Sequence, residues 1–554
     1  MAKRTRTDGH LSKEQYNARV TASSLQVSRI VDGGKQGSRP TGRLDADTQV
    51  ARQLTSSGLA KMRLLNKTFK SAVDGVLAEE EDADLTGMIS DYFTYSARVK
   101  RTYLATAGQV HMCGNGDCGQ LGFGTEELRD MEIKTPRLLP MISQEKASIH
   151  RVVSLACGAV ATAALTKFGK VYTWGSSDDG GLGRPGGSTA PEQFPHQVVD
   201  GLEGTTIIGL AAGDCQTLAL DLSGKVYGWG CYKDKAGQNL WREWGGWSEG
   251  KPWFQPPPFA SAKSCKGAAK RPVPITGLPD CVVEVQCGAS FCLALTKKQE
   301  VFSWGIGEIG ELGREVCPMK HPPVPGSEEE PGYDFEGILR DHLTPGGMYK
   351  EPVAGEVVGA RMENVKAIGC GEYHSLVISA GDSDVFACGL NSYGQLGLGD
   401  KTNRMRLALI DTFLGRYATA ATGGAQHSLV LTADGLFSFG RNDSGQLGCS
   451  ERISKSDWGL SIETPQEVFL PPDAGRPLQV ECGTNHCLVI TDKHELYTWG
   501  YGDSGALANG SDADCTLPKK VDLTRFNVSK VFDVSGGGHH TALVCETDET
   551  KEWW

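Results

Sequence analysis

The 554-residue sequence contains no apolar run that approaches the length of a membrane span. A helix needs about 20 consecutive apolar residues to cross a bilayer. The chain also begins with the polar stretch MAKRTRTDGH instead of an apolar signal segment. We therefore expect no membrane partner, and we expect the 17 cysteines to be reduced thiols in the cytosol or nucleus.

Acidic residues outnumber basic ones over most of the chain. The formal net charge is −11, which argues against a body that coats nucleic acid. Residues 1–50 are the exception, because they hold nine Lys and Arg residues against five acids. We predict that residues 1–50 form a basic, largely disordered tail, in which Lys3, Arg4 and Arg6 are candidate contacts to DNA phosphates.

Glycine is the residue in excess, at 71 positions, nearly double the usual share of about 7%. The spacing G-x-G-x-x-G, which can mark a dinucleotide-binding loop, begins at Gly114, Gly305 and Gly500. A true fingerprint opens a helix inside a βαβ unit. Each copy here follows a short aromatic strand and leads into a polar turn. We therefore interpret these residues as turn glycines.

Two motifs repeat along the chain. The first is an aromatic strand of the type V-Y-x-W-G, most often followed by a loop that ends in G-x-L-G. It occurs as QVHMCG (109–114), KVYTWG (170–175), KVYGWG (225–230), EVFSWG (300–305), DVFACG (384–389), LFSFG (436–440) and ELYTWG (495–500). The second joins a small residue and a glycine to an apolar strand, as CGAVATAAL (157–165), AGDCQTLAL (212–220), CGASFCLAL (287–295), CGEYHSLVI (370–378), GGAQHSLVL (423–431), CGTNHCLVI (482–490) and GGGHHTALV (536–544).

Seven copies of each motif predict an all-β fold, a seven-bladed β-propeller. The aromatic strand at 109–114 precedes every copy of the second motif, and the last copy of the second motif, at 536–544, has no aromatic strand after it. We therefore predict that N-terminal strands complete the last blade and close the ring, which removes free sheet edges.

The same patterns give the domain boundaries. We predict a propeller over 99–550, with insertions at about 231–274 and 315–352. Residues 51–98 are predicted to be a partly helical linker, because apolar residues recur at helical spacing between 59 and 77 and favour a short helix there.

Cysteine pairs such as CGASFC (287–292) and CGTNHC (482–487) raise the question of a metal site. The first cysteine of each pair occupies a repeat position for small residues, which holds Cys157, Ala212, Cys287, Cys370, Gly423 and Cys482. We therefore expect small buried residues there, no metal site and no cofactor. The sequence also contains no Ser/His/Asp arrangement that indicates covalent catalysis.

Both motifs, with the G-x-L-G turn, resemble the regulator-of-chromosome-condensation propeller. The resemblance covers about residues 99–550 and specifies the fold, because scaffolds, ubiquitin-ligase modules and exchange factors share these repeats. The stretch GNGDCGQLGFGTEELRDMEIKTPRLLP resembles the opening blade of the family's exchange factor for the small GTPase Ran. The resemblance implies Ran as a partner, and chromatin as a second partner, reached through histones and through DNA contacts of the tail. It also implies a location in the nucleus, on chromosomes, with the cytoplasm possible, and no covalent chemistry.

The resemblance also implies functional residues. Asp214 in AAGDCQT matches an acid that faces the GTPase, and other copies hold other residues at this repeat position, so the fold does not require a carboxylate there. His427 and His540 match positions linked to exchange or GTPase contact. These two histidines share their repeat position with His374 and His486, and a hydrogen-bonded histidine near the hub is the alternative explanation.

Further implied contacts lie in turns. Arg314 in GELGR and Asp117 in GNGDCGQLG are expected on surface turns at positions that match family contact residues. Lys233 and Asp234 in YKDKAG match the wedge that presses on the nucleotide-binding elements of the GTPase.

Three departures from the family pattern leave a non-exchanging scaffold or chromatin adaptor open. Ser290 stands where the family exchange factor has a second functional acid, and Ala161 replaces a family histidine. The loop that supplies a nucleosome-binding arginine in the family is acidic here, at Glu328, Glu329 and Glu330. A plant ultraviolet-B photoreceptor is a third interpretation, but it needs a cluster of inward tryptophans that these strands do not predict.

Overall fold

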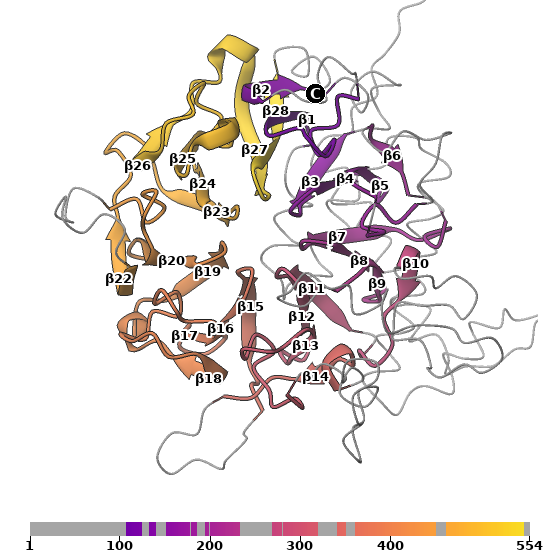
Figure 1. The fold of residues 1–554 in the computed structure, drawn as a ribbon, viewed down its shortest axis with the longest axis vertical. Helices are drawn as coiled ribbons and strands as arrows, with labels where there is room; N and C mark the ends of the chain where they lie inside the picture. The colour runs from indigo at the N-terminus through magenta and orange to yellow at the C-terminus, as the bar shows by residue number, and fades with distance from the viewer. Residues whose placement is uncertain are drawn as a thin grey trace, which may run out of the picture. The chain divides into compact units, whose positions relative to one another are not determined.

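In the computed structural model, short strands follow one another in antiparallel hairpins. The structure describes residues 107–124, 132–139, 151–177, 179–184, 194–198, 200–232, 269–279, 281–318, 341–350, 361–449 and 461–547. Within these ranges the strands form seven four-stranded sheets around a common axis (Figure 1). The prediction of an all-β, seven-bladed propeller is therefore confirmed.

Six of the described sheets consist of four consecutive strands. The first three contain β3 (Val152–Cys157), β4 (Ala161–Thr166), β5 (Val171–Gly175) and β6 (His196–Gln197); β7 (Ile207–Ala212), β8 (Gln216–Asp221), β9 (Val226–Gly230) and β10 (Ala269–Pro274); β11 (Val282–Cys287), β12 (Phe291–Thr296), β13 (Val301–Gly305) and β14 (Gly346–Gly347). The next three contain β15 (Val365–Cys370), β16 (His374–Ser379), β17 (Val385–Gly389) and β18 (Arg404–Leu409); β19 (Ala418–Gly423), β20 (His427–Thr432), β21 (Leu436–Arg441) and β22 (Ser461–Val468); β23 (Pro477–Cys482), β24 (His486–Thr491), β25 (Leu496–Gly500) and β26 (Cys515–Lys520). Short 3-10 turns are η2 (Asp411–Phe413), η4 (Asp503–Gly505) and η5 (Thr524–Phe526).

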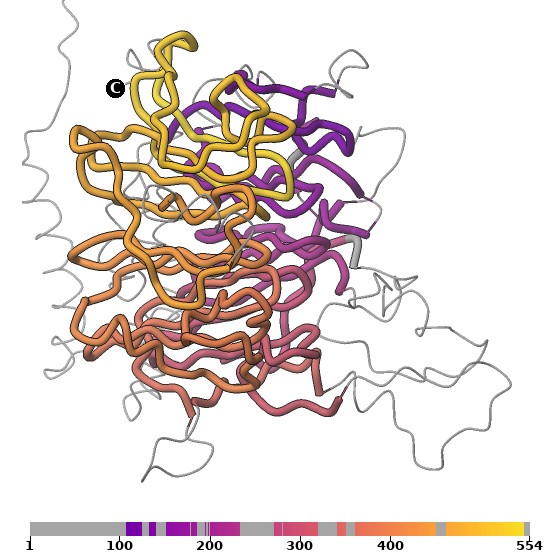
Figure 2. Tube along the Cα trace, turned by 60° about the vertical axis from the view of Figure 1, so that its left-hand side comes forward, coloured from indigo at the N-terminus to yellow at the C-terminus, as the bar shows by residue number. Residues whose placement is uncertain are grey.

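The remaining sheet joins the two ends of the described chain. Its order is β2 (Ile133–Leu138), β1 (Gln109–Gly114), β28 (His540–Thr547) and β27 (Val528–Gly536). Strand β1 pairs with β28 along its full length, from Gln109 opposite Cys545 to Gly114 opposite His540. The indigo start of the described chain lies against its yellow end in both views (Figures 1 and 2). The predicted closure of the last blade by N-terminal strands is thus confirmed.

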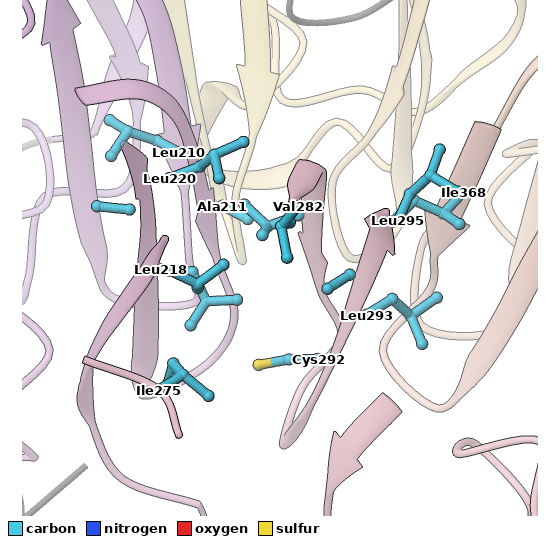
Figure 3. Packing of buried hydrophobic residues seen from close by; sticks show 14 of the residues in the cluster. Leu210, Ala211, Leu218, Leu220, Ile275, Val282, Cys292, Leu293, Leu295 and Ile368 are labelled. Carbon is cyan, nitrogen blue, oxygen red and sulfur yellow. The ribbon is translucent and has the colours of Figure 1, made fainter. Parts of the chain in front are cut away.

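Apolar side chains fill the space between neighbouring sheets. Leu218 and Leu220 of β8 face Val282 of β11, while Leu293 and Leu295 of β12 extend the same core toward β15 (Figure 3). All five side chains are almost completely buried. Since burial of a Leu or Val side chain contributes about 1.5–3 kcal/mol, this packing between sheets is a main source of stability.

The glycine of the second motif lies where the sheets meet at the axis. A Cβ atom on Gly158 would lie 2.2 Å from the carbonyl oxygen of Gly213, and a Cβ on Gly213 would lie 2.2 Å from that of Gly288. The same close approach, at 2.7 Å or less, continues around the ring and returns to its start through Gly371, Gly424, Gly483 and Gly537. The repeat therefore requires glycine here because neighbouring turns come too close for any side chain.

The G-x-L-G turn supports the aromatic strand of the next blade. In the last copy of this arrangement, the indole Nε1 of Trp499 donates a hydrogen bond to the carbonyl oxygen of Gln446 at 3.0 Å. A Cβ on Gly448 would lie 2.7 Å from that indole nitrogen, and its φ of +64° also favours glycine. Gly114, where the first G-x-G-x-x-G begins, ends strand β1 and has a φ of +112°. These are turn glycines, as the sequence predicted.

Several predicted segments lie wholly or partly outside the described residues. The basic tail, the linker and the short helix at 59–77 are among them. Most of both insertions lies outside as well. The last residues of the segment 231–274 form strand β10, and strand β14 lies within 315–352.

Candidate partner-binding face

One face of the propeller carries the turn after each innermost strand and the loop after each aromatic strand. In an antiparallel sheet, alternate connections lie at the same end of the strands. The β7–β8 turn with Asp214 and the β13–β14 loop with Glu308 therefore share a face with the β1–β2 loop, which carries Asp117. We call this face the Asp214 face.

A hollow of about 320 Å³ opens on this face near the axis. Among the described residues, five acids line it, and no Lys, Arg or His does. The acids are Asp179, Asp214, Glu308, Glu311 and Glu372. Such a concentration of carboxylates creates a negative potential that a cationic group of a partner would neutralise.

Asp214 is half-buried in the tight turn between β7 and β8. Its backbone N–H donates to the carbonyl oxygen of Ala289 at 3.1 Å, which ties this turn to the next sheet. Ser290, the residue that stands in place of a family acid, lines the same hollow. The structure therefore places Asp214 and Ser290 in the same hollow, and of these two residues only Asp214 carries a carboxylate.

Glu372 occupies the repeat position of Asp214 in another sheet, in the turn between β15 and β16. Burial and the charge of Asp214 raise the pKa of its carboxyl to about 7, and a hydrogen bond with Thr484 opposes this shift. Burial, together with the charges of Glu372 and Asp214, also raises the pKa of Tyr373 to about 12. The charge of the hollow therefore changes close to neutral pH.

His427 and His540 lie beneath the Asp214 face and are completely buried. The Nε2 atom of His540 is 3.0 Å from the hydroxyl of Thr162, and that of His427 is 3.2 Å from the Sγ atom of Cys487. Each contact joins one sheet to the next. The structure thus places both side chains in the hub, as the alternative explanation for this repeat position expected.

Arg314 differs from expectation, because its side chain is buried and does not lie on a surface turn. Its guanidinium donates hydrogen bonds to the carbonyl oxygens of Asp341, His342 and Thr344 at 2.9–3.3 Å. Arg184 follows the corresponding Leu-Gly in another copy and is buried in the same way. Burial lowers the pKa of the Arg314 guanidinium. In these two copies the arginine holds the segment that leads to the fourth strand.

Asp117 is exposed on the β1–β2 loop, as expected. Its backbone N–H and its carboxylate both bond to the side chain of Asn115, at 2.8 and 3.0 Å. Of the predicted site residues that the structure describes, Asp214 lines the acidic hollow, whereas Asp117, Arg314, His427 and His540 do not.

The predicted wedge begins at Tyr232, which is buried and accepts a hydrogen bond from Trp304 at 2.9 Å. In other blades this indole bonds to a G-x-L-G carbonyl, so the tyrosine substitutes for the missing turn. Lys233 and Asp234 lie outside the described residues, as do Lys3, Arg4 and Arg6.

Sequence reasoning missed Glu372, Asp179, Glu308 and Glu311 as members of the hollow. The signal for Glu372 was present, since it is the other acid at the repeat position of Asp214. Asp179 and Glu308 occupy irregular loops, where no period indicates which way a side chain points.

Comparison with known proteins identifies the family. The RCC1-like domain model matches residues 109–543, which is most of the chain. This chain belongs to the RCC1-like domain family. The recognition of the regulator-of-chromosome-condensation family from the sequence is thus confirmed.

Curated relatives of this RCC1-like protein carry different functions. It is 27% identical to the human regulator of chromosome condensation, with 83% of this chain and 96% of that one covered. It is 26% identical to guanine nucleotide exchange factor SRM1 of Saccharomyces cerevisiae, with coverages of 79% and 88%. It is also 25% identical to ultraviolet-B receptor UVR8 of Arabidopsis thaliana, with coverages of 86% and 91%.

The fold has solved counterparts. The structure of Prp20p from Saccharomyces cerevisiae, studied with its binding to Gsp1p and histones, matches with a TM-score of 0.62 and 24% identity. The match covers 81% of this RCC1-like chain and 94% of that one. At this identity the likeness establishes the propeller fold.

Among the described residues, no helix has the length and apolar character for a membrane crossing.

Proposed function

We propose that this RCC1-like protein is a guanine-nucleotide exchange factor for the small GTPase Ran and acts at chromatin in the nucleus. The observation that carries the proposal is the acidic hollow around Asp214 on one face of the propeller. Relatives that include an exchange factor support it, as does a solved relative studied for its binding to Gsp1p and histones.

Exchange requires no covalent chemistry from the protein. It requires that the nucleotide-free GTPase binds more tightly than the loaded one, because a ligand shifts an equilibrium only by its differential affinity. Each 1.4 kcal/mol of that preference weakens nucleotide binding about tenfold. In this proposal the acidic hollow holds a cationic segment of the rearranged GTPase, and the net charge of −11 speeds its capture.

The other predicted residues take roles that follow from their positions. His427 and Arg314 are buried, so they act as positioning residues for the hub turn and for the loop beside the hollow. Asp117, being exposed, is proposed to contact the GTPase directly, as are Lys233 and Asp234 in the wedge that starts at Tyr232. His540 is proposed to keep the last blade aligned with the first through Thr162.

Chromatin contact is assigned to histones and to the basic tail. Lys3, Arg4 and Arg6 are proposed to neutralise DNA phosphates. Because each such contact releases counterions, this part of the binding should weaken as salt concentration rises. The acidic loop at Glu328–Glu330 is not proposed as a nucleosome contact.

The test follows release of a fluorescent guanine nucleotide from Ran. We expect the wild-type protein to accelerate release over the spontaneous rate, and Asp214→Ala to lower that acceleration by about tenfold or more, because a buried charge pair loses one partner. Asp382→Ala is the matched control, since Asp382 is an exposed acid in the β16–β17 turn on the opposite face. It should exchange like wild type.

The outcomes separate the candidate functions. Equal rates for wild type and Asp214→Ala would contradict the role of Asp214 while leaving exchange intact. No acceleration by the wild-type protein would contradict exchange itself and favour a non-exchanging scaffold or chromatin adaptor. That second function is supported by Ser290 in the hollow and by Ala161 at the start of β4, both of which replace functional family residues.

A further inference from the structure

The turn between the two innermost strands holds a pair of directly opposite residues in every described sheet. The last residue of the inner strand faces the second residue of the next strand. The pairs are Cys157–Thr162, Ala212–Thr217, Cys287–Cys292, Cys370–Ser375, Gly423–Ser428, Cys482–Cys487 and Gly536–Thr541. Two of these seven described pairs have cysteine on both sides, so the fold does not require such a pair.

The hub histidines show what the second member of the pair normally does. His374 reaches the hydroxyl of Ser428 at 2.7 Å, and His540 reaches that of Thr162 at 3.0 Å. The serine hydroxyl donates in turn to the carbonyl oxygen of Gln395 at 2.7 Å. A hydroxyl at this position therefore provides the hydrogen-bond partner that the hub histidine needs. A thiol at the same position needs a separate explanation.

A thiol occupies this position at one histidine-bearing junction. The Nε2 atom of His427 on β20 lies 3.2 Å from the Sγ atom of Cys487 on β24. Cys482 stands directly opposite Cys487, so a second thiol joins the pair. One atom from each of the three side chains lies within 4.8 Å of the other two, and all three residues are buried.

The geometry points to a buried zinc site formed by His427, Cys482 and Cys487. In a tetrahedral site, thiolate and imidazole atoms bonded to zinc lie about 3.3–3.8 Å apart. The side chains therefore need only small movements to enclose an ion. Zinc balances the charge of two thiolates beside a neutral imidazole, and a buried site without net charge avoids a large desolvation cost.

The surroundings supply a further ligand and a route of entry. The carbonyl oxygen of Gln446 lies 3.2 Å from the Sγ atom of Cys487 and can take the fourth position. Cys482 also lines a second cavity, distinct from the acidic hollow, at the axis of the ring, together with Glu481 and Thr484. An ion can thus reach the site along the axis. Spacing within CGTNHC could not reveal the site, because its third ligand comes from the neighbouring blade.

The chain offers its own control. Cys287 and Cys292 face each other with Sγ atoms 3.7 Å apart, but the repeat position of His427 on the preceding sheet is Gln216. Gln216 donates to the carbonyl oxygen of Gly288 at 3.0 Å. This second pair has the same two thiols without the histidine, so it is not expected to hold zinc.

The test measures zinc per chain by mass spectrometry after purification in zinc-containing buffer and removal of free metal. The variants are Cys482→Ala and Cys487→Ser, each of which introduces the residue of another blade, as at Ala212 and Ser428. We expect one zinc per chain in the wild type and in the matched variants Cys287→Ala and Cys292→Ser, and loss of that zinc in Cys482→Ala and Cys487→Ser. Matching melting temperatures in metal-free buffer show that these variants fold.

A second measurement needs no variant. Titration of the metal-free wild type with Co²⁺ should give thiolate charge-transfer absorbance that saturates at one equivalent and disappears on addition of zinc. Absence of zinc and of this absorbance would overturn the site, and so would zinc that persists in Cys482→Ala and Cys487→Ser. Neither result depends on exchange activity, so the zinc site is tested independently of the proposed function.

Discussion

Glu372 and Asp214 show how two residues at one repeat position can act on each other across the hub. Both line the acidic hollow, and burial together with the charge of Asp214 raises the pKa of Glu372 to about 7. The remaining repeat positions carry no carboxylate, so this coupling belongs to these two sheets. It makes the charge of the candidate site depend on pH within the physiological range.

This coupling gives a pH prediction. Glu372 is protonated below pH 7 and charged above it, so the hollow becomes more negative as pH rises. If it holds a cationic segment of Ran, affinity measured by calorimetry should increase between pH 6 and pH 8, by up to about tenfold. Glu372→Gln should flatten the increase.

The contribution of Glu372 to the free energy of unfolding changes in the opposite direction. The folded pKa of Glu372 lies above the unfolded value, so its contribution is complete below about pH 4.5 and is lost as pH rises through 7. An affinity that rises equally steeply in Glu372→Gln would contradict the assignment of Glu372.

Among the structural elements, the turn at the axis is the most constrained. The glycine of each such turn approaches the carbonyl oxygen of the next, and the contacts form a closed ring. Backbone hydrogen bonds reinforce it, for example from Ala425 N–H to the carbonyl oxygen of Thr484 at 2.9 Å. Because each turn contacts the next, a substitution that displaces one turn also displaces its neighbours.

A substitution in this ring should be costly. In Gly158→Ala the new Cβ would lie 2.2 Å from the carbonyl oxygen of Gly213, which is backbone and cannot rotate away. We expect urea unfolding to show a loss of about 1–3 kcal/mol or more. Gly381→Ala is the control, since nothing lies within 4 Å of its Cβ. Equal stability of the two variants would mean that the hub tolerates expansion.

The repeat elements were predictable from the sequence because each is specified by a local pattern. The V-Y-x-W-G strands and the small-Gly motif fixed the number of blades, and the position of QVHMCG at the start fixed the closure. The burial of Arg314 was not predicted, since its partners Asp341, His342 and Thr344 lie inside the insertion predicted at 315–352. Arg184, at the same repeat position, was the available hint.

The candidate site was only partly predictable. Asp214 was found because it matches a family acid and because the other copies of the repeat, except the one with Glu372, lack a carboxylate there. Its neighbours Asp179 and Glu308 come from loops of other sheets, and His427 meets Cys487 across a blade boundary. Contacts between blades depend on the curvature of the ring, and no periodicity in a single sequence encodes it.

At the scale of the whole molecule, buried histidines tie the sheets together. Burial lowers the pKa of His374 and of His540 to about 3, against 6.5 for an exposed histidine. The unfolded chain therefore binds protons that the folded chain cannot, at any pH between about 6.5 and 3. Stability is fully retained above pH 6.5 and falls as the solution is acidified.

Acid should therefore loosen the whole ring. Each of these histidines removes about 1.4 kcal/mol of unfolding free energy for every pH unit below 6.5. We expect the urea midpoint to fall between pH 7 and pH 5, and the fall to be smaller in His540→Gln, which introduces the residue of Gln216. A midpoint that does not change over this range would contradict the neutral, buried state of these side chains.

Because β1 pairs with β28, the propeller can close only after β28 has been synthesised. Of the described strands, β1 at Gln109–Gly114 leaves the ribosome first, and its partner β28 at His540–Thr547 leaves last. More than four hundred residues are translated between the β1–β2 hairpin and β28. During that time the free edge of β1 can pair with other strands. A nonsense mutation between Leu138 and His540 would consequently leave β1 and β2 without their partner strand and the ring open.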